Sequence, residues 1–349
     1  MQTEHFWKTL QVPILGLSPM DGLTDHPFRH IQKKYGQPAV VYTEFTSVEG
    51  VCHGATQLLK DFLFDETQRP VIAQIYGTTP KFFRQTAVLL CELGFDGIDI
   101  NMGCPAKNVA HSGAGAALIK NPKLGQEIIR ETQAGVTDWQ NGMTAKDCPD
   151  ISEEIAQVVT ARKQKLSDLY QQKRTVPVSV KTRVGYTDPV VSEWIPTLLE
   201  MEPAAIALHG RTLQQQYSGL ASWEEIGKAA EIIHKTTTRI VGNGDVSSYA
   251  DALHKVETYG TDGVLIGRAS LGNPFVFLPH TPVAINVFDI ALEHAVLFET
   301  TFKDDPRYNF LPMRKHLAWY VRAIPNAVEI RTKLVLSSSA SEVREILTE

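Results

Sequence analysis

Cys104 is the side chain in this sequence that is best placed to act as an acid or a nucleophile. It lies in Asn101-Met-Gly-Cys-Pro105, soon after the apolar run Ile98–Ile100, which predicts a short buried strand. Gly103 permits unusual backbone angles and Pro105 stops the strand, so the thiol is expected on a loop at the C-terminal end of that strand. A lone cysteine is more often a small buried apolar residue, and this loop position is what favours a chemical role.

Seven further apolar segments predict strands that alternate with helical segments: Pro13–Ser18, Ala39–Glu44, Pro70–Ile75, Val176–Lys181, Ala204–His209, Thr238–Asn243 and Asp262–Gly267. Near-continuous apolar strands separated by helices are typical of a parallel sheet. Eight such units match the typical size of a (β/α)8 TIM barrel, about 250 residues. We therefore predict an α/β fold of this type. A doubly wound open sheet is the alternative, disfavoured because no Gly-x-Gly-x-x-Gly follows the first strand.

Polar residues and glycines follow several of these strands, where a barrel gathers its active site. The last two loops suit a phosphate, because glycine lets the backbone approach and an arginine adds charge. Lys181 would be costly to bury without an anionic partner. The candidates at the strand ends are Ser18, Pro19, Met20, Gln74, Asn101, Cys104, Lys181, Arg183, His209, Asn243, Gly244, Asp245, Gly267 and Arg268.

The strand pattern also divides the chain. Residues 1–281 are predicted to form the barrel, with a helical insertion at about 136–175 that carries six acidic and six basic residues and so has no electrostatic preference for RNA. Residues 282–349 show only helical patterns, at Phe288–Phe302, Leu311–Ile324 and Ala327–Leu336, and predict a small helical domain.

Composition sets limits on the class of protein. The chain has 349 residues, 43% of them hydrophobic, and a formal charge of -5, so wholesale attraction to nucleic acid is excluded while a local basic patch is not. Its four cysteines form no CxxC pair and no metal-ligand cluster, which predicts reduced thiols, a cytoplasmic location and no metal site. We expect no signal peptide, because the N-terminus lacks a charged start followed by an apolar segment. We expect no membrane span, because no run reaches the ~18 apolar residues required.

The Cys104 loop resembles the signature of the tRNA-dihydrouridine synthases. The resemblance rests on Asp99-Ile-Asn-Met-Gly-Cys-Pro105, Lys107-Asn-Val109 and Gly113-Ala-Gly115, and on the opening Ser18-Pro-Met-Asp-Gly-Leu-Thr-Asp25, in which Ser18 replaces alanine. Further blocks follow in the family's order: Gln74-Ile-Tyr-Gly77, Val180-Lys-Thr-Arg183, His209-Gly-Arg-Thr212, Gly242-Asn-Gly-Asp245, Ile266-Gly-Arg268 and Met313-Arg-Lys-His-Leu-Ala-Trp-Tyr320.

This resemblance implies an FMN enzyme that reduces the C5–C6 bond of uridine in tRNA, with NADPH as reductant. Hydride would pass from FMN to C6, and Cys104 would protonate C5. Asn101, Lys181 and Arg183 would hold the uracil. Ser18, Pro19, Met20, Gln74, Lys181, His209, Asn243, Gly244, Asp245, Gly267 and Arg268 would surround FMN.

A basic segment near the C-terminus is expected to bind tRNA phosphates. It holds Glu329 as its one acidic residue and has a local charge of +5; its cations are Arg307, Arg314, Lys315, Arg322, Arg331 and Lys333. The alternative is a solvated helix face, with Trp319 and Tyr320 as core aromatics. We expect the protein to be a monomer.

Two other functions fit part of the pattern. An FMN barrel that acts on a small molecule, such as dihydroorotate, would share the barrel and the phosphate loops but would not need the basic C-terminal helices. An RNA-binding protein without chemistry would not need Cys104, Lys181 and His209 together.

Overall fold

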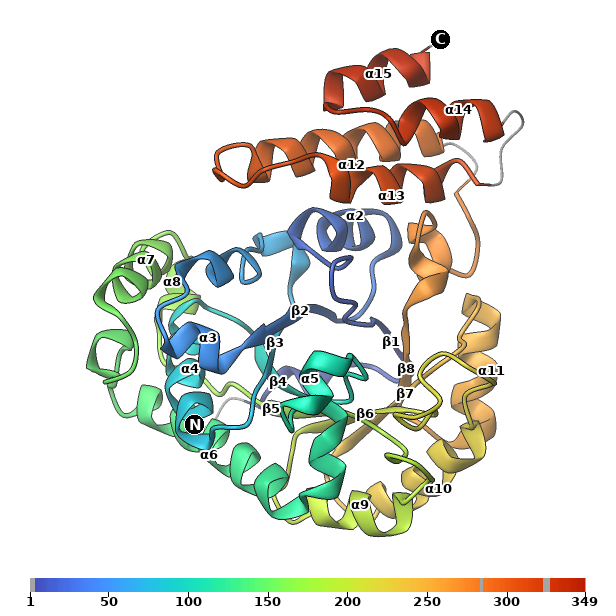
Figure 1. The fold of residues 1–349 in the computed structure, drawn as a ribbon. Coiled ribbons are helices and arrows are strands. Elements are labelled where there is room, and N and C mark those ends of the chain that lie inside the picture. Colours follow the sequence, from blue (N-terminus) through green and yellow to red (C-terminus); the bar gives the residue numbers. More distant parts are fainter. Residues whose placement is uncertain (1–3, 283–284, 323–326, 349) are drawn as a thin grey trace.

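The computed structural model describes residues 4–282, 285–322 and 327–348, except for the side chain of Lys107. Its eight strands form one parallel sheet in the order β1-β8-β7-β6-β5-β4-β3-β2 (Figure 1). The ends of this sheet meet through backbone hydrogen bonds from Leu17 N to Val40 O, 2.9 Å, and from Ala39 N to Leu15 O, 2.7 Å. The predicted (β/α)8 barrel is thereby confirmed. The strands are β1 (Ile14–Leu17), β2 (Val41–Ser47), β3 (Val71–Tyr76), β4 (Gly97–Met102), β5 (Val178–Arg183), β6 (Ala205–His209), β7 (Arg239–Asn243) and β8 (Gly263–Ile266).

Helices surround the barrel, and local signals set several of their ends. Asp25 caps α2 by accepting a hydrogen bond from Phe28 N at 2.9 Å, and Gly260 ends α11 with a left-handed φ of 65°. The barrel helices are α1 (Phe6–Thr9), α2 (His26–Gly36), α3 (Val48–Cys52), α4 (Pro80–Glu92), α5 (Lys107–His111), α6 (Pro122–Gln140), α7 (Glu153–Lys163), α8 (Asp168–Gln171), α9 (Val191–Leu199), α10 (Trp223–Ile233) and α11 (Tyr249–Tyr259). Short 3-10 turns are η1 (Thr56–Lys60), η2 (Glu66–Gln68), η3 (Gly115–Lys120), η4 (Ala145–Asp147), η5 (Arg268–Ser270) and η6 (Pro274–Phe277).

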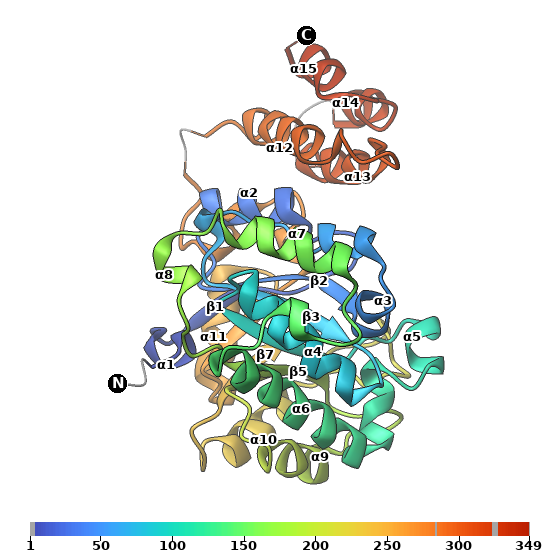
Figure 2. The ribbon, with the colours of Figure 1, turned by 90° about the vertical axis from the view of Figure 1, so that its left-hand side faces the viewer.

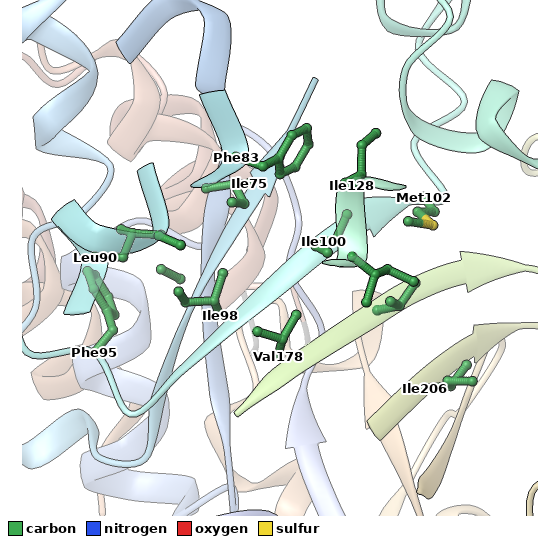
Figure 3. Packing of buried hydrophobic residues seen from close by; sticks show 14 of the residues in the cluster. Ile75, Phe83, Leu90, Phe95, Ile98, Ile100, Met102, Ile128, Val178 and Ile206 are labelled. Atoms are coloured by element: carbon green, nitrogen blue, oxygen red, sulfur yellow. The ribbon is translucent and has the colours of Figure 1, made fainter. Parts of the chain in front are cut away.

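The strands are buried on both faces. On the outer face, Ile98 and Ile100 of β4 pack among side chains such as Leu90 of α4 (Figure 3). A separate cluster that includes Tyr42 and Val241, with Trp7 of α1, packs against the other strand face. Burial on both faces is the physical reason for the near-continuous apolar runs in the sequence.

The predicted insertion at 136–175 begins too early. Residues 136–140 complete α6, because Val136 and Trp139 continue its buried face. The remainder forms η4, α7 and α8, with Ile155 of α7 buried in the outer core. Arg162 Nη1 donates to Leu59 O at 2.7 Å, so this segment supports η1 on the barrel.

The C-terminal helices are α12 (Val287–Phe302), α13 (Leu311–Tyr320), α14 (Ala327–Leu334) and α15 (Ala340–Thr348). They share a second buried cluster and lie over α2 in both views (Figures 1 and 2). Glu293 of α12 accepts hydrogen bonds from Lys34 Nζ at 2.7 Å and Tyr35 Oη at 2.6 Å, both at the end of α2. The helix predicted to reach Ile324 ends at Tyr320, and residues 323–326 lie outside the described part.

Candidate active site

The strand register brings the predicted polar residues to one end of the barrel. Asn101 of β4 pairs with Lys181 of β5, and Arg183 of β5 pairs with His209 of β6. His209 in turn pairs with Asn243 of β7. These residues lie at the C-terminal ends of their strands, next to the Cys104 loop, as the sequence predicted.

The side chain of Asn101 holds the Cys104 loop in place. Its Oδ1 accepts hydrogen bonds from Cys104 N at 2.8 Å and from Gly103 N at 3.0 Å. Its Nδ2 donates to Gln74 Oε1 at 2.9 Å. Arg183 binds the same loop from the other side, through Nε to Gly103 O at 2.7 Å. The backbone that carries the thiol is therefore held at both edges.

Asp99 of β4 holds Gln74, which in turn holds Asn101 and the Cys104 loop. It is fully buried and accepts hydrogen bonds from Gln74 Nε2 at 2.8 Å and from Ser179 Oγ at 2.7 Å. Burial raises the pKa of this carboxyl to about 6, against the opposing effect of both bonds. Asp99 was not among the predicted site residues, although an acid inside an apolar strand is a signal for such a role.

The Cys104 thiol is kept protonated by its surroundings. It is 9% exposed and clusters with Val109 and Ala114. Burial raises the pKa of the thiol, and the negative charge of Asp21 adds to the rise. The group therefore carries its proton at neutral pH, which suits an acid better than a nucleophile.

Lys181 is a half-buried cation whose hydrogen-bond partner is neutral. Its Nζ donates to Asn243 Oδ1 at 3.1 Å, and Asn243 is held by its own bond from Nδ2 to Leu265 O at 2.9 Å. Burial, reinforced by the nearby charge of Arg183, lowers the pKa of Lys181 to about 8. Such a cation is poised to gain from an anionic ligand.

Further cations surround His209. Burial and the charges of Lys181 and Arg183 hold the pKa of His209 well below its ordinary value, so its ring is neutral. Asp245 accepts from Arg211 Nη2 at 2.7 Å and from Arg268 Nη2 at 2.8 Å, which fixes both guanidinium groups. Arg211 belongs to the predicted His209-Gly-Arg-Thr212 block at the end of β6, but the sequence did not assign it to FMN.

Two of the predicted glycines, Gly244 and Gly267, lie close to this group of side chains. A Cβ on Gly244, where φ is +123°, would lie 2.6 Å from Ala221 Cβ and 3.0 Å from His209 Cδ2. A Cβ on Gly267 would lie 3.4 Å from Met20 Sδ, so the loops after β1 and β8 meet here. A half-buried glycine at position 267, a neutral imidazole and clustered cations fit an anionic ligand such as a phosphate.

Five of the predicted tRNA-binding cations lie on α13, just after it, and on α14, whereas Arg307 precedes α13 and pairs with Asp305 at 3.2 Å. Arg314 donates to Ser337 O at 2.7 Å and to Leu336 O at 3.1 Å, and Lys315 donates to Gly22 O of the β1–α2 loop. Lys333 lies 4.0 Å from a carboxylate oxygen of Glu329. Arg322 and Arg331 are exposed. Arg314 and Lys315 thus take part in internal contacts, while Arg322 and Arg331 face solvent.

The described residues contain neither a metal-binding cluster nor a membrane-spanning helix. Within residues 4–282, 285–322 and 327–348, no cluster of three or more histidine, cysteine or acidic side chains could hold a metal ion. No helix in the described part is long and apolar enough to span a bilayer.

Comparison with known proteins decides the family. The model of the dihydrouridine synthase family, Dus, matches residues 16–146 and 151–349. The chain belongs to the dihydrouridine synthase family. The match includes the Cys104 loop and the helices α12–α15, so the resemblance predicted from the sequence is confirmed.

Curated relatives in the dihydrouridine synthase family match over nearly their whole length. The probable tRNA-dihydrouridine synthase of Staphylococcus aureus (strain COL) is 33% identical over 353 residues, covering 99% of this chain and 95% of the relative. The probable tRNA-dihydrouridine synthase 2 of Bacillus subtilis (strain 168) is 33% identical over 353 residues, covering 99% and 96%. Residues 147–150, which separate the two matched parts, lie in the insertion before α7.

Proposed function

We propose that this protein reduces the C5–C6 bond of a uridine in tRNA to 5,6-dihydrouridine, with FMN as cofactor and NADPH as reductant. The observation that carries the proposal is the Cys104 loop, which Asn101 and Arg183 hold by hydrogen bonds beside a cluster of cations. Membership of the dihydrouridine synthase family supports the tRNA substrate. The clustering of Cys104, Lys181 and His209 disfavours an RNA-binding protein without chemistry.

The residues at the barrel mouth fit FMN. In the proposed complex, the cations and glycine backbone after β7 and β8 bind its phosphate, and Lys181 lies near the flavin ring. When bound in its reduced form, FMN supplies a hydride for uracil C6. The residues proposed to surround it are Ser18, Pro19, Met20, Gln74, Lys181, His209, Asn243, Gly244, Asp245, Gly267 and Arg268, joined by Arg211.

Cys104 completes the reduction by donating its proton to C5. The hydride at C6 and the proton at C5 together saturate the bond, and the thiolate left behind regains a proton from solvent. Both polar ends of Asn101 are engaged by the protein, and Arg183 binds the backbone oxygens of Gly103 and Thr212. We therefore propose that these two residues position the acid and the loops around the uracil.

The direct test is nucleoside mass spectrometry of unmodified tRNA treated with the purified protein and NADPH. We expect dihydrouridine to form, and the purified protein to show a flavin absorption spectrum. A flavin-loaded protein that yields no dihydrouridine from a full tRNA pool would contradict the proposal and favour a small-molecule reductase.

The exposed cations of the C-terminal helices are expected to contribute salt-dependent affinity for tRNA. Replacing Arg322 or Arg331 by alanine should reduce the slope of log K against log salt by about 0.7–0.9 for each phosphate that the side chain neutralises. Equilibrium binding of tRNA between low and moderate salt measures this slope. The matched control is Lys146→Ala, an exposed cation in the insertion. Equal slopes for the wild type and all three variants would exclude a phosphate interaction at these two arginines.

FMN affinity is expected to fall as the pH rises above about 8. The pKa of Lys181 is about 8 in the protein without ligand, and the negative charge that the flavin ring gains on reduction would raise it. Below pH 8 the Lys181 ammonium is already charged when FMN binds. Above pH 8 the amine must take up a proton on binding, so the affinity for FMN declines. Anaerobic titration of the FMN-free protein with reduced FMN at pH 7 and pH 9 measures the effect. Lys181→Arg should abolish the decline, because a guanidinium does not titrate in this range.

A further inference from the structure

A cavity of about 200 Å³ lies between the barrel and the C-terminal helices. The barrel contributes the β1–α2 loop, β2 and the end of η1 to its lining, and the helical part contributes α12 and the segment that leads into α13. An apolar cavity of about 150 Å³ is known to hold benzene, so the space suits a single heterocyclic ring system.

One wall of this cavity carries three carboxyl groups. Asp25 accepts a hydrogen bond from Phe28 N and Asp61 accepts one from Thr46 Oγ1, whereas the Glu44 carboxyl accepts none from the residues that the structure describes. Asp25, Glu44 and Asp61 all line it. Burial and the neighbouring acids raise the pKa of Glu44 to about 8, while burial raises those of Asp25 and Asp61 to about 6. The nearby Arg29 guanidinium is engaged elsewhere, with Thr24 O at 2.6 Å and Gln68 Oε1 at 3.0 Å.

The opposite wall is aromatic. Phe302 and Tyr308 line the cavity and are half-buried, and Phe298 packs between them with ring centroids 5.1 Å and 6.3 Å away. Lys60 and Arg307 also line it, as does Asp305, which accepts hydrogen bonds from Arg307 Nε and Nη2 at 3.2 Å. A metal ion is a poor occupant for a cavity that contains two cations, whereas an aromatic ring with N–H donors and a nearby phosphate matches every wall.

The cavity belongs to the same face of the barrel as Cys104. It opens beside the β1–α2 loop, where Gly22 lines it and Lys315 of α13 donates to Gly22 O. The charge of Asp21, in the same loop, raises the pKa of both the Cys104 thiol and the Glu44 carboxyl, in each case in addition to burial. The β1–α2 loop thus adjoins both the cavity and the Cys104 loop.

We propose that the cavity binds one unstacked nucleobase of the tRNA, close in sequence to the reduced uridine, which presents N–H donors to the carboxyl wall and stacks on Phe302 and Tyr308. Guanine fits best, because its imino and amino groups offer adjacent donors to one carboxyl group. This inference rests on the proposed function and extends it to substrate selection. Sequence-specific RNA recognition commonly uses unstacked bases in this way, with hydrogen bonds to the base edge and stacking on aromatic side chains.

The test compares Phe302→Leu, which keeps an apolar side chain, with Phe302→Tyr, which keeps the aromatic ring. Stacking contributes about 1–3 kcal/mol per base, so Phe302→Leu should lower kcat/KM for tRNA about 5–150-fold. It should weaken the equilibrium Kd for tRNA in the same range and leave FMN content unchanged. Phe302→Tyr should retain near wild-type values, as should Val296→Ala, an exposed control on the same helix.

Substituted transcripts then identify the base. Each nucleotide near the mapped dihydrouridine is changed to uridine in turn, and one change should lower kcat/KM for the wild-type enzyme. That change should cause no further loss in Phe302→Leu or in Glu44→Gln, because the interaction is already missing. Two results would overturn this inference without affecting the proposed function. In one, every substituted transcript lowers kcat/KM as much in Phe302→Leu as in the wild type; in the other, no substitution lowers kcat/KM in the wild type. If the wild-type protein makes no dihydrouridine, the proposed function fails first.

Discussion

Replacing Cys104 by alanine is expected to lower the rate of dihydrouridine formation by about 10²–10⁴-fold, the usual contribution of a positioned general acid. The thiol is the proposed proton donor, and burial keeps it protonated at neutral pH. A single-turnover experiment measures the effect directly: protein with reduced flavin is mixed with unmodified tRNA, and flavin reoxidation and dihydrouridine are followed together.

Two comparisons make this experiment decisive. Cys148→Ala removes another buried free cysteine, far along the chain in the insertion, and should behave as wild type. Because a general acid acts in its protonated form, the wild-type rate should fall as the pH rises through the raised pKa of the thiol. A Cys104→Ala enzyme with the wild-type rate and pH profile would assign the proton to another group.

Replacing Lys181 by methionine is expected to weaken FMN binding by about 30-fold or more. Removing one partner of a buried charge pair typically costs at least about 2 kcal/mol, and 1.4 kcal/mol is a factor of ten. The methionine fills much of the same space, so the reduced affinity reports the charge. Anaerobic titration of the flavin-free protein with reduced FMN gives the Kd.

The control for this variant is Lys235→Met, which removes an exposed lysine after α10 and should leave the Kd unchanged. Lys181→Arg keeps a cation and should recover most of the affinity. If methionine and arginine at this position bind FMN as tightly as the wild type does, Lys181 does not face the flavin, and its unneutralised charge must serve the uracil.

The sequence by itself determined the barrel and most of its polar mouth. Each strand is buried on both faces, so each leaves a local apolar run that can be recognised without knowing its neighbours. The residues that follow those runs, such as Lys181, His209 and Asn243, had to meet, because parallel strands end at the same edge of the barrel. The early start assigned to the insertion was wrong because Val136 and Trp139 continue an apolar helix face, which a polar helical pattern beyond it obscured.

Only the tertiary structure decided what each polar group contacts. Arg183 binds the carbonyl oxygen of Gly103, 80 positions away in the chain, and Asp99 supports the Cys104 loop only through Gln74 and Asn101. Such pairings depend on strand register and loop path, which leave no local pattern. The cavity between the barrel and α12 is the clearest example of a site without a local pattern. Its aromatic and acidic walls come from segments more than two hundred positions apart, and they meet only when the C-terminal helices pack on the barrel.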